Sequence, residues 1–129
     1  MALILIIDDQ PESCELVQEI LEDGGHQVLT ATSWIDGTSQ IHRHHPDLIL
    51  IDVQMPQLRG PQGLQLLRQF TNRKLPKMVF LSAMDEGELH KLTKLHAADG
   101  YIQKGNLTGI LEKIEEILSS SDDENSEPL

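Results

Sequence analysis

The feature that most constrains the fold is a set of short apolar runs that lack alternation and are followed by an acidic residue. Leu3–Ile7 runs into Asp8, and Leu48–Ile51 runs into Asp52. Both runs are rich in isoleucine and leucine on consecutive positions, which is typical of parallel strands buried on both faces. Three further segments are predicted as strands by the same reasoning: Val28–Ala31, Met78–Leu81 and Gly100–Ile102.

The segments between these strands have the spacing of amphipathic helices. In the first of them, Pro11 suits an opening helical turn, and Gly24 and Gly25 end the apolar periodicity. Strand and helix therefore alternate five times, which predicts one α/β domain with a doubly wound parallel sheet covered by five helices. The remaining predicted helices are Trp34–His44, Gly63–Phe70, Glu86–Leu95 and Leu107–Leu118.

Composition excludes several classes of protein. The formal net charge is -11 in 129 residues, which argues against direct binding to a nucleic acid backbone. No apolar run approaches the roughly 20 residues that cross a bilayer, so no membrane association is expected. The single cysteine, Cys14, cannot form an internal disulfide, which favours a cytoplasmic location and predicts a buried, inert thiol. Residues 119–129 contain four acidic and no basic side chains, and we expect a disordered tail or the start of a linker.

Polar residues collect where the predicted strands end. Asp8 and Asp9 follow the first strand, Asp52 follows the third, Ser82 the fourth, and Lys104 comes just after the fifth. In a parallel sheet these ends share one rim, the usual ligand site of such folds. Each residue alone fits a turn former or a surface charge, but three crowded carboxylates repel each other and imply a bound cation. Oxygen ligands without histidine or cysteine favour Mg²⁺.

The same residues resemble the signature of the receiver domains of bacterial response regulators. The resemblance covers residues 1–118 and implies the flavodoxin-like, CheY-like strand order 2-1-3-4-5. It rests on Asp8-Asp9, on Asp52 followed by Met55-Pro56 and Gly60, on Ser82-Ala83, and on Tyr101 with Lys104.

This resemblance implies a phosphorylation-activated switch. Asp52 would accept a phosphoryl group from a sensor histidine kinase or a histidine phosphotransfer protein. Mg²⁺ would be held by Asp9, Asp8, Asp52 and the backbone carbonyl of Gln54. The domain would catalyse only its own phosphorylation and dephosphorylation.

Three further residues complete the implied machinery. Lys104 would contact a phosphoryl oxygen, Ser82 would hydrogen-bond the phosphoryl group, and Tyr101 would turn inward as Ser82 moves. The fourth helix, fifth strand and fifth helix would then form the face for a downstream target or a linked output domain, with phosphorylation-dependent dimerisation left open.

One departure and two alternatives accompany this interpretation. Gly105 stands where the family usually has a proline, often after a cis bond that positions the lysine, and a cis bond before glycine would cost about 2.5–4 kcal/mol. The first alternative is a pseudo-receiver that acts as an interaction module without phosphorylation, although Asp8, Asp9, Asp52, Ser82 and Lys104 are all present. The second is a flavodoxin-like enzyme or cofactor carrier, which the acidic first strand end disfavours.

Two histidine-containing clusters have a structural explanation as well as a functional one. His42, His44 and His45 at the end of the second helix fit a solvated helix end better than a metal site. His90, Lys91 and Lys94 on the fourth helix fit an exposed charged face or a partner surface equally well.

Overall fold

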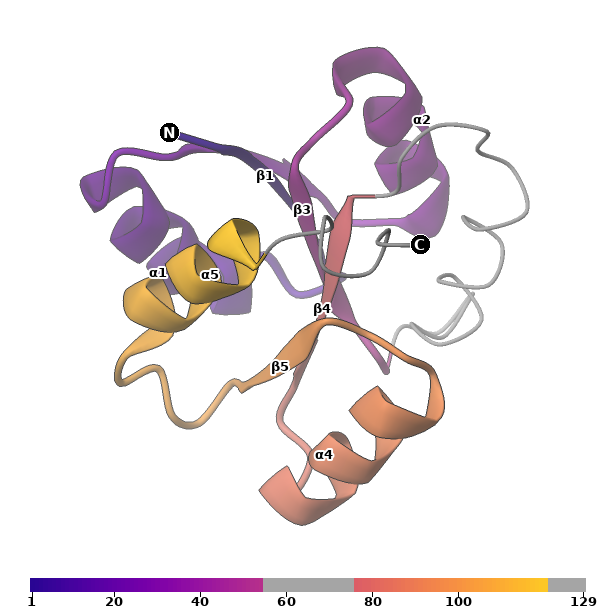
Figure 1. Ribbon diagram of the computed structural model, residues 1–129. Coiled ribbons are helices and arrows are strands. Elements are labelled where there is room, and N and C mark those ends of the chain that lie inside the picture. The colour runs from indigo at the N-terminus through magenta and orange to yellow at the C-terminus, as the bar shows by residue number, and fades with distance from the viewer. Residues whose placement is uncertain (55–75, 121–129) are drawn as a thin grey trace, which may run out of the picture.

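The computed structural model describes residues 1–54 and 76–120, and its centre is a five-stranded parallel sheet in the order β2-β1-β3-β4-β5 (Figure 1). The predicted flavodoxin-like order is therefore confirmed. Each strand matches its predicted segment to within one residue at either end. The strands are β1 Leu3–Ile7, β2 Gln27–Ala31, β3 Leu48–Asp52, β4 Lys77–Ser82 and β5 Gly100–Gln103.

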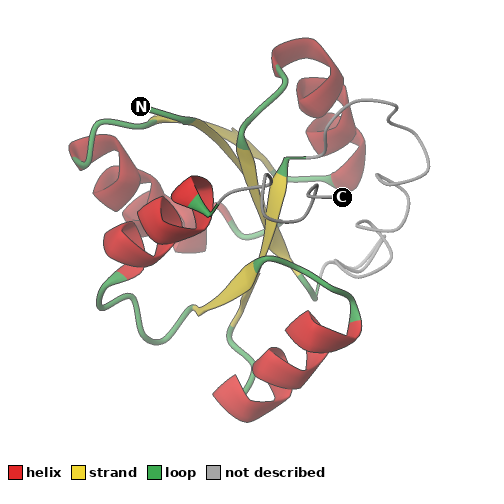
Figure 2. Ribbon diagram, in the orientation of Figure 1, coloured by secondary structure: helices red, strands yellow, loops and turns green. Residues whose placement is uncertain are grey.

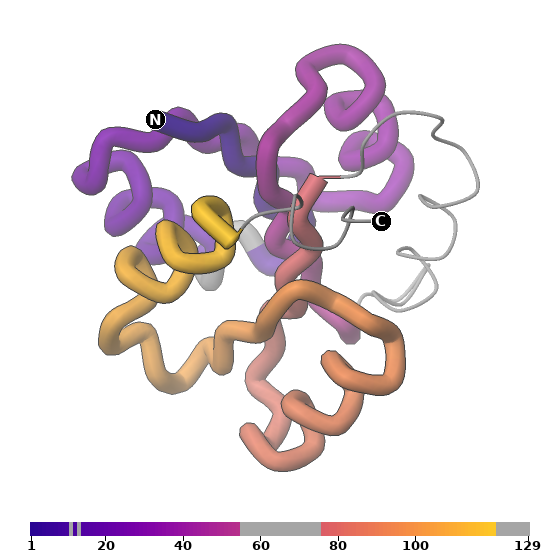
Figure 3. Tube along the Cα trace, in the orientation of Figure 1, coloured from indigo at the N-terminus to yellow at the C-terminus, as the bar shows by residue number. Residues whose placement is uncertain are grey.

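Helices cover both faces of the sheet (Figures 2 and 3). In the described residues a helix follows each strand except β3, after which residues 55–75 lie outside the described part of the chain. In Figure 1, α1 and α5 lie on one side of the sheet and α2 and α4 on the other. The predicted helix Gly63–Phe70 lies outside the described residues. The described helices are α1 Pro11–Asp23, α2 Trp34–His44, α4 Glu86–Leu95 and α5 Ile110–Ser119. None of these is long and apolar enough to cross a membrane.

The strands bury alternate residues in two separate cores. Leu48 and Leu50 of β3 face a core shared with α1 and α5, whereas Ile49 and Ile51 face a second core with α2 and α4. Every residue of β3 is buried, which explains why the sequence shows no alternation. The central strands are thus held on both faces, and their carboxyl ends form a fixed rim.

The helix boundaries follow local capping chemistry. Ser33 Oγ accepts a hydrogen bond from the backbone N–H of Asp36 at 3.1 Å and opens α2, and Asp85 accepts from the N–H groups of Gly87 and Glu88 and opens α4. These side chains satisfy N–H groups that lack partners within the helix.

The predicted start of the last helix at Leu107 is wrong by three residues. Gly109 has φ 73°, a left-handed conformation that cannot continue a helix, and α5 begins after it at Ile110. The Asn106 side chain accepts a hydrogen bond from the N–H of Thr108 at 3.2 Å, so a turn occupies the predicted first residues.

Candidate functional site

The acidic rim lies at the carboxyl ends of the central strand β3 and of its neighbour β1. Asp8, Asp9 and Asp52 each offer a carboxylate oxygen, and these atoms lie within 4.8 Å of one another. Asp8 is fully buried, Asp52 is 3% exposed and Asp9 is half-buried. The sequence prediction that these three carboxylates meet is confirmed by the geometry.

Backbone hydrogen bonds fix the two buried carboxylates. The backbone N–H of Asp8 donates to the carbonyl of Ala31, which continues the sheet ladder one residue beyond β1. The Asp8 carboxylate in turn accepts from the N–H of Gln10, and the Asp52 carboxylate accepts from the N–H of Gln54, both at 2.9 Å. The loops after β1 and β3 therefore fold around their own acidic residue, in the manner of Asx turns.

Lys104 supplies the positive charge of the site. Its Nζ atom lies 2.9 Å from Asp8 Oδ2 and 3.5 Å from Asp52 Oδ2, and only 14% of the side chain is exposed. The N–H of Lys104 donates to the carbonyl of Ser82 at 2.7 Å, so the β4–β5 ladder places this residue at the rim. The Lys104–Gly105 peptide bond is trans, as are the other peptide bonds in the described part of the chain.

The charges of the rim perturb each other. Burial raises the pKa of Asp52 and the Asp8 carboxylate adds to this, against the opposing effects of the Gln54 N–H and the Lys104 ammonium. Burial alone would lower the pKa of Lys104, but its hydrogen bond to Asp8 and the charges of Asp52 and Asp8 raise it. The ionised lysine is thus favoured, whereas the ionised Asp52 is costly.

Cys14 belongs to the core that the sheet shares with α1 and α5, and its side chain lies next to Asp8. Its side chain is buried, as predicted, and burial together with the nearby Asp8 carboxylate raises its pKa to about 12. A thiol with so high a pKa is a poor nucleophile, because the thiolate is the reactive form.

Ser82 and Tyr101 lie on the face of the sheet that α2 and α4 cover. Phe80 and Tyr101 are partners in the β4–β5 register, and Ser82 follows Phe80 by two residues, so the three side chains point to the same side. Ser82 is fully buried and its Oγ accepts from the N–H of Met84 at 3.0 Å. Tyr101 is partly buried, and its hydroxyl donates to Glu86 Oε2 at 3.2 Å.

The histidine clusters behave differently from one another. His42, His44 and His45 are exposed at the end of α2, and within residues 1–54 and 76–120 they belong to no group able to hold a metal. The His90 ring packs edge-on against the Tyr101 ring, and the two ring centres lie 5.7 Å apart. Nothing in the sequence indicated this contact.

A doubly wound parallel sheet in the order 2-1-3-4-5, with an acidic rim and a lysine beside it, defines the CheY-like class of fold, and comparison with known proteins identifies the family. Residues 4–115 match the model of the response regulator receiver domain. This chain therefore belongs to the receiver domains of two-component response regulators.

Relatives and solved structures agree with this assignment. The chain is 32% identical to the protein PilH of Pseudomonas aeruginosa, covering 81% of this chain and 86% of PilH. It is 31% identical to the chemotaxis protein CheY of Treponema pallidum, with 89% and 81% covered. The receiver domain of a response regulator from Bermanella marisrubri has a TM-score of 0.80 at 23% identity, with 91% and 98% covered, which shows the shared fold.

Some relatives are much longer than this chain. It is 34% identical to the alkaline phosphatase synthesis transcriptional regulatory protein PhoP of Bacillus subtilis over 78% of this chain, but it spans only 41% of PhoP. The family membership supports a phosphorylation-activated signalling domain and points to no other catalytic activity.

Proposed function

We propose that Asp52 is the residue that accepts the phosphoryl group. The observation that carries this proposal is the position of its carboxylate, at the end of the central strand β3 between two further carboxylates and the Lys104 ammonium. A carboxylate oxygen of Asp52 attacks the phosphorus of a phosphohistidine, the P–N bond breaks, and the departing imidazole keeps the bonding electron pair. The product is an acyl phosphate on Asp52.

The donor set of the rim fits a hard divalent cation. Asp9, Asp8 and Asp52 present oxygen atoms close together, and the Gln54 backbone carbonyl, next to the Asp52 turn, would add a neutral oxygen ligand. A bound Mg²⁺ would supply charge neutralisation for the transferring phosphoryl oxygens, which is most of what such a transfer requires. Asp9 is the most accessible of the three carboxylates and is proposed as a direct ligand.

Lys104 holds the two buried carboxylates before transfer and then binds the product. Its Nζ lies 3.5 Å from Asp52 Oδ2, so a small movement would bring it onto an oxygen of a phosphoryl group on Asp52. The ammonium acts as a flexible point charge and needs no planar alignment.

Ser82 and Tyr101 would convert the new charge into a change of surface. Ser82 Oγ accepts only a backbone N–H in the described contacts, so its hydroxyl proton is available to a phosphoryl oxygen. Movement of Ser82 vacates space on the face that it shares with Tyr101, and the ring turns inward. The phosphoryl group thereby shifts the balance between two conformations.

This function implies its partners and setting. The phosphodonor is a sensor histidine kinase or a histidine phosphotransfer protein in the cytoplasm, and the receiver domain comprises residues 1–118, followed by the acidic tail. The output is a target protein or a linked domain that reads the surface of α4, β5 and α5.

The test is the intact mass of the purified chain after incubation with Mg²⁺ and a small acyl phosphate donor. We expect one phosphoryl adduct in the wild type, and none in Asp52→Asn or in EDTA. Asp23→Asn, an exposed aspartate at the end of α1, is the matched control and should still form the adduct. Absence of an adduct in the wild type, even with a cognate kinase present, would favour the pseudo-receiver instead.

A further inference from the structure

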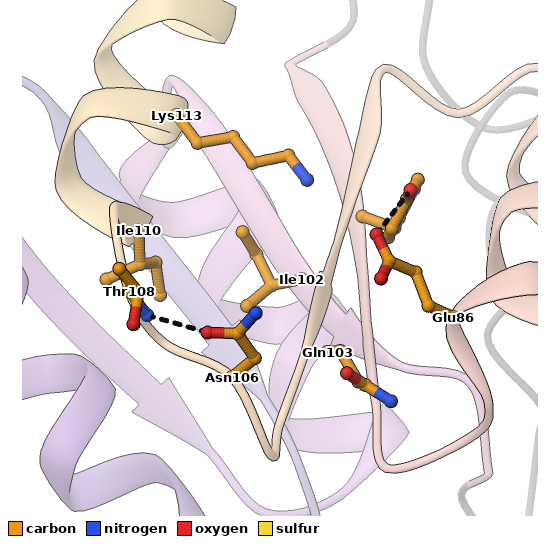
Figure 4. A pocket seen from close by; sticks show the side chains of 8 residues that line it. Glu86, Ile102, Gln103, Asn106, Thr108, Ile110 and Lys113 are labelled. Atoms are coloured by element: carbon orange, nitrogen blue, oxygen red, sulfur yellow. Dashed lines mark hydrogen bonds between the residues drawn. The ribbon is translucent and has the colours of Figure 1, made fainter.

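Charged residues from α4 and α5 flank the partly buried Tyr101 side chain. Its hydroxyl donates to Glu86 Oε2 at 3.2 Å, and Lys113 Nζ lies 4.2 Å from the centre of its ring. His90 packs edge-on against the same ring. Figure 4 shows Glu86 and Lys113 reaching toward one open pocket from the α4 side and the α5 side, and Tyr101 lines this pocket.

The starts of α4 and α5 position Glu86 and Lys113 beside Tyr101. The Asp85 cap starts α4 so that Glu86 lies in its first turn, next to the end of β5. Gly109 starts α5, and its carbonyl accepts from the N–H of Lys113 at 3.0 Å, so Lys113 lies one turn into that helix. Since each helix start is capped or fixed by a special backbone conformation, the two side chains flank Tyr101 without any ligand.

We propose that Glu86 and Lys113 are positioning residues that hold Tyr101 in its outward orientation and thereby set the resting bias of the switch. The proposal rests on the function proposed above, in which Tyr101 turns inward. Turning inward breaks the hydrogen bond to Glu86 and removes the ring from under the Lys113 ammonium. Both losses disfavour the inward state before phosphorylation.

The contacts distinguish these two residues from their charged neighbours. Glu88 lies in the same first turn of α4 as Glu86, and Lys91 is an exposed lysine of that helix, but neither has a contact with Tyr101. An effect of general surface charge would appear equally in all four residues. An effect through the tyrosine would appear only in Glu86 and Lys113.

The sequence contains one tyrosine, so a fluorine-labelled tyrosine gives a single NMR resonance from this site. The readout is the solvent-isotope shift of that resonance, which measures exposure of the ring, in the unphosphorylated chain. We expect Lys113→Met and Glu86→Met each to raise the ratio of inward to outward ring by about two- to five-fold. This is the range for an exposed cation–π contact, which Lys113→Met removes, and it lies within the range for a net hydrogen bond, which Glu86→Met removes. Lys113→Arg should restore the wild-type shift.

Glu88→Met and Lys91→Met are the matched controls and should leave the resonance as in the wild type. The rate of adduct formation should rise by about the same two- to five-fold in the variants, and this rise should vanish when Tyr101 is replaced by alanine. Wild-type exposure of the ring in both Lys113→Met and Glu86→Met would overturn the proposal, as would equal changes in the controls. Loss of the mass adduct in every variant, with the exposure change intact, would refute only the phosphorylation chemistry.

Discussion

Replacing the proposed acceptor should stabilise the protein in the absence of divalent cations. In Asp52→Asn the amide keeps an oxygen for the N–H of Gln54 but removes a negative charge from a rim that is mostly closed to water. Burial raises the pKa of Asp52, so at neutral pH its ionised form makes the folded state less stable than a neutral side chain would.

The magnitude follows from the distances at the rim. The oxygen atoms of Asp8 and Asp9 lie within 4.8 Å of that of Asp52, and each repulsion is worth about 3.5 kcal/mol at an effective dielectric constant of about 20. The attraction of Lys104 at 3.5 Å is worth about 5 kcal/mol on the same scale. The repulsions therefore exceed the attraction by about 2 kcal/mol. Burial of Asp52 adds to this difference, whereas the hydrogen bond from the Gln54 N–H and screening at the half-buried Asp9 subtract from it, and we expect a net gain of about 1–2 kcal/mol.

A divalent cation should remove this advantage. A ligand at 100 times its dissociation constant adds about 2.7 kcal/mol to the stability of the folded state, and Asp52→Asn should bind the cation less tightly because it lacks one of the three carboxylates. The assay is urea unfolding followed by the fluorescence of Trp34, the single tryptophan, in EDTA and in saturating Mg²⁺. In EDTA the free energy of unfolding of the variant should be higher than that of the wild type. In saturating Mg²⁺ this difference should disappear.

The control for this experiment is Glu19→Gln, which removes an exposed charge from the middle of α1. It should change the free energy of unfolding by no more than about 0.5 kcal/mol in either buffer. If Asp52→Asn is as stable as the wild type in EDTA, or less stable, then repulsion between the carboxylates does not dominate the rim. The inference of a cation site from crowded charge would then be refuted.

Three further predictions concern other parts of the fold. Because burial raises the pKa of Cys14 from 9.0 to about 12, the free energy of unfolding should fall above pH 9 by up to about 1.4 kcal/mol per pH unit, a component absent from Cys14→Ala in urea titrations. Burial and the Glu86 carboxylate raise the pKa of Tyr101, so Glu86→Met should bring it down toward 10.0 in a phenolate absorbance titration. A Cβ atom at Gly37 would lie 2.6 Å from Ile7 Cδ1, so Gly37→Ala should lower stability by about 1–3 kcal/mol in urea unfolding, and Ile7→Val should recover part of it.

The strands were predictable because both of their faces are buried. Every residue from Ile4 to Ile7 is fully buried, and this uniform burial requires the uniform apolar sequence from which the strand was predicted. Once five strands alternate with helices, few right-handed windings remain, and the order 2-1-3-4-5 is one of them. The start of α5 was less predictable, because the apolar Leu107 continues the helical pattern across Gly109, whose left-handed backbone ends it.

The acidic rim was predictable for a similar reason, whereas the contacts of Tyr101 were not. Parallel strands bring their carboxyl ends together whatever the loops do, so Asp8 and Asp52 had to meet. The approach of Glu86 and Lys113 to Tyr101 depends on the angle at which two helices pack beside β5. No periodicity in the sequence records that angle.

In this fold Lys104 is positioned by a hydrogen bond between strands and not by a proline that follows it. The usual proline after this lysine is absent, and Gly105 follows a trans bond. The lysine nevertheless reaches both Asp8 and Asp52, because its backbone N–H extends the β4–β5 ladder to the carbonyl of Ser82. The same hydrogen bond ties Lys104 to the strand end that carries Ser82, so the movement that we propose for Ser82 would be passed directly to the backbone of the lysine.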